Sequence, residues 1–176
     1  IWNYGTNYPK MNPDTVREKL AEGRLHLQFV ASLYRVQAAE GRYYLHEHPA
    51  TALSWKEDVI TALARQPSAI LVTADQCQYG LVTPSAKDPT KMLPALKPTK
   101  FLTNSPLMAK QLQRRCDRSH KHQGLEGGRA RDAAFYPPGL VRAILRGMTL
   151  QAEEDHQALM GRVEETAKLA AMPMKS

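Results

Sequence analysis

The sequence predicts an α/β fold, because strand-like and helix-like segments alternate between residues 43 and 75. The aromatic run "RYYLHE" is followed by a helical pattern in "SWKEDVITALARQ" and then by the apolar run "SAILVTAD". A strand, helix, strand order with short connections predicts two parallel strands joined by a right-handed crossover. Functional groups gather at the carboxyl ends of such strands. We therefore expect Glu47 and Asp75, which close the two runs, to lie at one edge of the sheet, facing a shared cleft.

The segments before this unit predict an irregular arm and a long helix. Residues 1–13 are rich in turn-forming and aromatic residues, so no periodic element is expected there. Asp14 can cap a helix whose apolar residues recur near helical spacing, and Gly41 is expected to end that helix. Pro49 stops the strand that follows.

The segments after this unit predict a loop, a returning strand and further helices. Four prolines between residues 82 and 99 predict a long exposed loop, and "KPTKFLTN" is expected to return from it as a strand. The remaining elements are a short basic helix, an irregular loop rich in Gly and His, a helix opened by proline and a last amphipathic helix. Their expected ranges are 106–115, 116–132, "PPGLVRAILRG" and about 149–171.

Length and composition set the domain organisation. A chain of 176 residues with 43% hydrophobic content can bury one ordinary core. The expected division is an irregular arm over 1–13, an incomplete α/β domain over 14–147, and a carboxyl-terminal helix and tail over 148–176.

The charge of the chain favours a polyanion as partner. Lysine and arginine number 24 against 17 acidic residues, which gives a net charge of +7. Such a balance favours nucleic acid, although solubility alone also accounts for it. No apolar stretch is long enough for a membrane helix, and no signal-peptide pattern is present. The two cysteines form no dense framework, which favours a reducing compartment, so an intracellular location, nuclear or cytoplasmic, is expected.

Four residues of suitable type predict a metal site. The run "CDRSHKHQ" places Cys116, His120 and His122 within seven positions, and Cys77 at a strand end can supply a fourth ligand to tetrahedral zinc. The spacing is not that of a common zinc finger, so a basic loop with a buried cysteine is the alternative.

Glu47 stands in "HEHP", a turn directly after a strand. A carboxylate there can accept a hydrogen bond from an amino group or a protonated ring nitrogen of a bound base. The alternative is a glutamate that caps a helix or forms a salt bridge.

Four segments in this order resemble the carboxyl-terminal half of cytosine-5 DNA methyltransferases, especially phage and retroelement versions. They are "YYLHEHP", "DQCQYGL", "KPTKFLTNSP" and "RCDRSHKHQGLEGGRARDAAFYPPGLVRAIL", and together they span about residues 25–147. The resemblance implies a partial Rossmann-like methyltransferase sheet with flanking helices and an antiparallel returning strand.

The resemblance also implies roles for particular residues. Glu47 corresponds to the glutamate that grips the flipped cytosine, although His48 stands where the family has asparagine. Tyr136 and Pro137 open the final helix, which closes the pocket for S-adenosylmethionine. Contacts to DNA phosphates are expected from the basic residues Lys97, Lys100, Arg114, Arg115 and Arg129.

Two expected parts of such an enzyme have no counterpart in the sequence. The family's glycine-rich cofactor strand and its Pro-Cys nucleophile precede the glutamate, and no residue here matches either. A methyltransferase would therefore need an upstream segment or a partner chain. The alternatives are a non-catalytic structural or nucleic-acid-binding subunit of a larger assembly, and a zinc-stabilised binding module.

Overall fold

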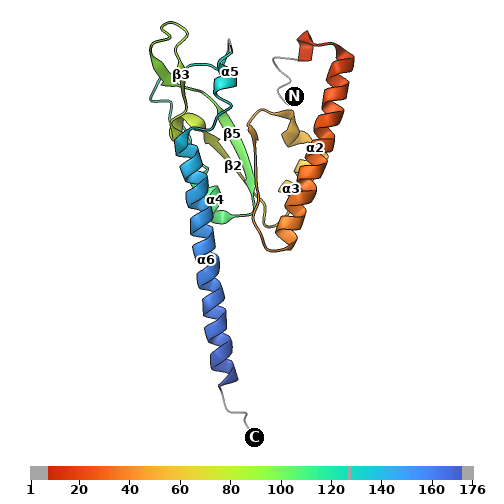
Figure 1. Cartoon of the computed structure of the whole chain (residues 1–176), viewed down its shortest axis with the longest axis vertical. Coiled ribbons are helices and arrows are strands. Elements are labelled where there is room, and N and C mark those ends of the chain that lie inside the picture. Colours follow the sequence, from red (N-terminus) through yellow and green to blue (C-terminus); the bar gives the residue numbers. More distant parts are fainter. Residues whose placement is uncertain (1–7, 127, 172–176) are drawn as a thin grey trace.

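The computed structural model describes residues 8–126 and 128–171, and it has a small antiparallel sheet between two long helices (Figure 1). Helix α2 (Pro13–Ala39) lies on one side of the sheet and α6 (Pro138–Ala170) on the other. The sheet contains β1 (Leu45–Pro49), β2 (Ile70–Asp75) and β5 (Pro98–Thr103). The expected α/β class with flanking helices and an antiparallel returning strand is confirmed.

The strand order differs from the expected one, because the returning strand lies in the centre of the sheet. The order is β1-β5-β2, and Phe101 of β5 pairs with both Glu47 and Val72 in antiparallel register. The expected direct pairing of 45–49 with 70–75 is therefore wrong, and no parallel Rossmann sheet is formed by the described strands. The central position suits β5 because both Phe101 and Leu102 are fully buried, one on each face of the sheet.

One face of the sheet packs against α6 and the short helix α4 (Pro106–Gln111). The buried core here contains Ala74, Tyr79, Phe101, Met108, Leu112, Leu140 and Ala143. Gly147 allows α6 and α4 to approach closely, since a Cβ atom at this position would lie 2.6 Å from the Cα atom of Met108. Helix packing on this face therefore depends on a residue without a side chain.

The opposite face packs against α2 and α3 (Asp58–Ala64). Its buried core contains Leu27, Tyr44, Ile60, Leu63 and Leu102. The turn η2 (Leu53–Lys56) leads into α3 and places Trp55 at the margin of this core.

The ends of α2 are close to those expected. The N-cap is Asn12 rather than Asp14, and the Asp14 amide donates to Asn12 Oδ1 at 2.8 Å. The helix ends at Ala39, followed by Gly41 with φ 70°. Of the expected irregular arm, residues 1–7 lie outside the described part, whereas Tyr8–Lys10 form the 3-10 turn η1.

The proline-rich segment contains a short hairpin where a loop is expected. Strands β3 (Val82–Pro84) and β4 (Met92–Pro94) pair antiparallel, with Pro84 and Pro94 at strand ends, where proline is tolerated. The short helix α5 (Arg129–Asp132) lies near this hairpin (Figure 1). A small third core of Leu81, Ala95 and Ala133 holds these loops together.

Helix α6 is one element where two helices are expected. It continues through Gly147, so the expected division at 147/148 falls inside it. Residues 152–171 are exposed, and this half of α6 extends beyond the rest of the chain (Figure 1). None of the helices in the described ranges has the combined length and apolar character that crossing a membrane requires.

Candidate metal centre

The four predicted metal ligands lie together at one end of the sheet. Cys77 belongs to η3 (Gln76–Tyr79), which follows β2 directly, whereas Cys116, His120 and His122 belong to the segment after α4. Their donor atoms all lie within 4.8 Å of one another, and each of the four residues is partly buried. The expected grouping is confirmed.

The distances between donor atoms match a tetrahedral zinc site. Ordinary zinc bond lengths imply separations of roughly 3.3 Å between two nitrogens and 3.6 Å between sulfur and nitrogen. Cys116 Sγ lies 3.6 Å from Nε2 of both His120 and His122, and His122 Nε2 lies 3.4 Å from Cys77 Sγ. The two Nε2 atoms are 3.0 Å apart. The remaining two separations lie within 4.8 Å, so the four donor atoms surround one space of about the size that a zinc ion needs.

Asp75 fixes the loop that carries three of the ligands. We call residues 114–122 the metal loop. The Asp75 amide donates to the Arg114 carbonyl at 2.9 Å, and Asp75 Oδ2 accepts from the Cys116 amide and from Arg115 Nε, each at 2.9 Å. Because Asp75 ends β2 and Cys77 follows it, one strand end positions both halves of the site.

A tight turn in the metal loop brings the histidines toward Cys116. Arg118 has φ 65°, a left-handed conformation that is uncommon for residues other than glycine. Its amide donates to Cys116 Sγ at 3.3 Å, which closes the turn over that sulfur. The turn places His120 and His122 on the same side, with ring centroids 4.4 Å apart.

The electrostatics of the cluster suit a cation. Burial raises the pKa of the Cys77 thiol to about 11, and the neighbouring Cys116 sulfur adds to this effect. A bound divalent cation reverses such a shift because it stabilises thiolate. Burial, followed by the nearby His120, lowers the pKa of His122 and favours the neutral imidazole that binds metal.

The chemistry of the donors limits which metal fits. Two thiolates and two imidazoles are the ligands of zinc, whereas Mg²⁺ and Ca²⁺ prefer oxygen. All four positions are supplied by the protein, as in structural zinc sites, so no open position remains for a substrate. The cluster can thus hold a metal such as zinc in a closed site.

Glu47 lies in the middle of β1 and takes part in a different group of side chains. Tyr136 donates to Glu47 Oε2 at 2.9 Å, and burial and this carboxylate raise the pKa of Tyr136. Lys97 Nζ lies 5.9 Å from the Tyr136 ring centroid and donates to the Ala133 carbonyl at 2.7 Å. Burial lowers the Lys97 pKa, and Glu47 opposes this effect. Pro137 is buried as the N-cap of α6.

Glu47 and Asp75 do not face one cleft, although both strands end at the same edge of the sheet. Glu47 and Val72 both pair with Phe101 and so lie on one face. Because side chains alternate along a strand, Asp75, three residues after Val72, lies on the other face. The shared cleft expected between them is therefore not formed.

The five basic residues expected to contact DNA have separate environments. Arg129 donates to the carbonyls of Pro84 and Glu126, and Lys97 to that of Ala133, so both help to hold the loops. Lys100 lies over Trp55, Arg114 over Tyr79, and Arg115 pairs with Asp75. Two arginines missed by the sequence analysis, Arg142 and Arg146, line a pocket with Arg114. Their spacing of four in "VRAILRG" is the signal for a shared helix face.

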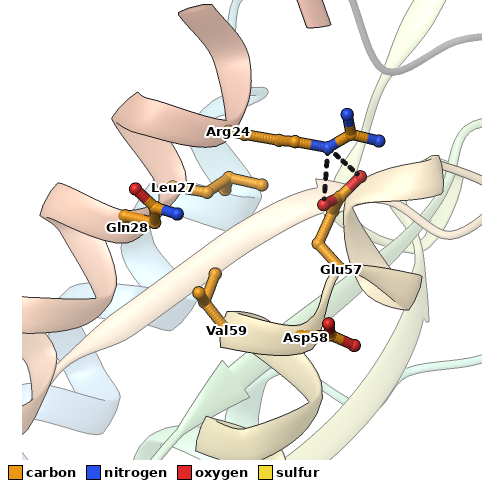
Figure 2. A pocket seen from close by; sticks show the side chains of 6 residues that line it. All are labelled: Arg24, Leu27, Gln28, Glu57, Asp58 and Val59. Atoms are coloured by element: carbon orange, nitrogen blue, oxygen red, sulfur yellow. Dashed lines mark hydrogen bonds and ion pairs between the residues drawn. The ribbon is translucent and has the colours of Figure 1, made fainter. Parts of the chain in front are cut away.

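A further pocket, of about 330 Å³, lies between α2 and α3 (Figure 2). Arg24 of α2 points across it toward Glu57, and Arg24 Nε lies 3.0 Å from Glu57 Oε2. Leu27 and Val59 line it below this ion pair. Because Arg24 and Glu57 neutralise each other, neither side chain is available as an unpaired charge to a ligand in this pocket.

Fold and site together define a mixed α/β chain with a Cys2His2 cluster. Comparison with known proteins adds no family to this description: no protein-family model, no curated protein and no solved structure gives a significant match.

Proposed function

We propose that this chain is a zinc-stabilised, non-catalytic module that binds nucleic acid. The single observation that supports the proposal best is the donor geometry of Cys77, Cys116, His120 and His122, which fits zinc and fastens the metal loop to the end of β2. A closed site of this kind stabilises structure, because all coordination positions are occupied by protein.

The metal loop carries the charge that the proposal requires. Arg114, Arg115, Arg118 and Lys121 are exposed, and Asp117 is the one acid between residues 114 and 122. A zinc ion with two thiolates and two neutral imidazoles adds no net charge, so the loop stays basic when metal is bound. Basic side chains held on an ordered loop bind phosphate groups, with an affinity that depends on salt.

The test combines metal analysis with a binding titration. Purified protein is expected to contain about one zinc per chain, and removal of the ion by a chelator is expected to weaken binding to a labelled DNA duplex. The physical reason is that metal ligation is coupled to folding of the loop. The matched control is His156→Asn, a histidine on the exposed half of α6, which should keep both zinc and binding.

Two results would contradict the proposal. The first is protein without metal that nevertheless shows the wild-type thermal transition. The second is a zinc-containing protein with no measurable affinity for duplex or single-stranded nucleic acid at low salt.

A second candidate is a cytosine-5 DNA methyltransferase-like segment that contributes the base-recognition glutamate to a larger enzyme. The observation that favours it is the hydrogen bond from Tyr136 to Glu47, which joins the residue assigned to base recognition with one assigned to the S-adenosylmethionine pocket. Under this proposal the partial methyltransferase sheet is completed by an upstream segment or a partner chain.

Glu47→Gln tests this candidate in the completed enzyme. Methyl transfer to DNA should fall far more than DNA binding, because the acid acts mainly in the transition state. Equal losses in both measurements would assign Glu47 to structure. Tyr136→Phe removes the hydrogen bond to Glu47, and it is measured beside Glu47→Gln in the same methyl-transfer and DNA-binding assays.

A further inference from the structure

A pocket of about 620 Å³ lies between the start of α6, the end of α4 and η3. Arg142 and Arg146 of α6 and Arg114 of the metal loop line it, and so do Gln78 and Gln111. The volume is in the range usual for ligand sites.

The charge of the pocket is positive and uncompensated. No acidic residue lines it, and in the described part of the chain none of its three arginines forms an ion pair with a carboxylate. Arg142 and Arg146 are separated by one helical turn, an arrangement of like charges that costs a helix stability. A bound anion would remove this repulsion.

The pocket is held in shape by packing rather than by the arginines. Tyr79 is 4% exposed, lies under the Arg114 guanidinium at 5.4 Å and donates to the Gln111 carbonyl at 2.8 Å. Gly139 brings α6 onto this floor, since a Cβ atom there would lie 2.2 Å from the Tyr79 carbonyl oxygen. The pocket therefore lies beside the first turn of α6, where the helix dipole adds positive potential.

We propose that this arginine pocket, formed by Arg114, Arg142 and Arg146, binds phosphate groups of a nucleic-acid backbone. The inference rests on the proposed nucleic-acid-binding function and names where the strand lies. Arg114 belongs to both the pocket and the metal loop, so positive charge continues from α6 through Arg114 to Arg118, whereas Arg115 is paired with Asp75. A continuous series of cations suits a polyanion with repeated phosphates, and guanidinium groups bind phosphate oxygens in pairs.

The experiment compares two variants with the same change in charge on the same helix. In Arg142→Gln/Arg146→Gln the pocket loses two cations, whereas Arg162→Gln/Lys168→Gln removes two from the exposed half of α6. Zinc-loaded proteins are titrated with a labelled duplex at several salt concentrations. Each lost phosphate contact makes the salt slope shallower by about 0.9 for a duplex or 0.7 for a single strand. The pocket variant is expected to lose one to two contacts and the matched control none.

Equal slopes for the two variants, or a wild-type slope for the pocket variant, would overturn the inference. So would displacement of the duplex by a phosphopeptide as effectively as by unlabelled oligonucleotide, which would assign the pocket to protein recognition. Inorganic phosphate at the same phosphate concentration is expected to compete poorly, and strong competition would assign the pocket to a free anion.

The failure of the proposed function and the failure of the pocket can be told apart. Wild-type protein that binds no nucleic acid refutes the proposed function itself, whereas wild-type binding with an unaffected pocket variant refutes only the pocket. Zinc content and thermal unfolding verify folding, and Arg146→Gln alone replaces the double variant if that one unfolds.

Discussion

The sheet with its helices and the loop region at its end are ordered by different means. The sheet is covered by two cores that include the fully buried side chains of Phe101, Leu63 and Leu140. The loop region, residues 80–97, 113–126 and 128–137, has a core of Leu81, Ala95 and Ala133. Alanine buries little apolar area, so this smaller core gives little hydrophobic stabilisation. Under the proposed zinc binding, metal ligation would supply in the loops the stabilisation that apolar packing supplies in the sheet.

Loss of a metal ligand is expected to have the largest effect. Cys116→Ser should abolish zinc binding and lower the free energy of unfolding by several kcal/mol, because ligand binding is coupled to folding of the loops. Elemental analysis and thermal unfolding check it. His156→Asn, which removes a histidine outside the cluster, should match wild type. A zinc-free Cys116→Ser protein with unchanged thermal stability would show that the loops are ordered without metal.

The second prediction concerns pH and the helix-covered sheet. His46 is 5% exposed, and burial, followed by the charge of His48 and His26, lowers its pKa from 6.5 to about 4. Between these values the unfolded chain binds more protons than the folded chain, so stability is present above pH 6.5 and is lost as the pH falls toward 4. A shift of this size corresponds to about 3 kcal/mol.

Denaturation curves between pH 4 and 7 on wild type and His46→Leu check this prediction. The variant should show a flatter pH dependence, while the metal-binding histidines contribute equally to both proteins and cancel. His156→Gln is the control with one exposed histidine fewer. Parallel curves for wild type and His46→Leu would assign the acid sensitivity to other groups, such as the metal site or His48, whose pKa burial also lowers.

Alanine substitutions at two glycines of α6 distinguish the effect of close packing on stability from the effect of helix propensity. Gly147→Ala should destabilise the protein by about 2 kcal/mol, because the added methyl group meets Met108 in the α4 contact. Gly161→Ala lies in open space on the exposed half and should stabilise the helix by up to about 1 kcal/mol. Chemical denaturation with zinc present measures both. A stabilising effect of Gly147→Ala would mean that α6 is not closely packed against α4 at Gly147.

The smallest effect is expected at the ion pair between α2 and α3. Arg24→Gln removes the contact with Glu57, and exposed pairs of this kind contribute little because water and salt screen them (Figure 2). The change in thermal unfolding should be the least of the four and should vanish at high salt. A larger loss than that of Gly147→Ala would show that this ion pair, rather than apolar packing, joins the two helices.

Part of the candidate site was predictable because its ligands are close in sequence. Cys116, His120 and His122 fall within one loop, so a single turn brings them together. Cys77 was predictable for another reason, since it follows the clearest strand in the chain and strand ends gather at one edge. The arginine pocket was not predictable from the sequence, because Arg114 lies near Arg142 and Arg146 only when α6 packs against η3.

By itself the sequence determined the elements whose cause is local. The apolar run of β2, the prolines at the starts of α4 and α6, and the left-handed Gly41 after α2 act within a few residues of themselves. Which strands and helices lie next to one another was decided only by the tertiary structure. Strand β5 lies between β1 and β2 because it alone of the three buries large apolar side chains fully on both faces, and α6 continues through Gly147 because α4 packs there. Both outcomes depend on competition between distant segments for burial and hydrogen bonds, which no local pattern records.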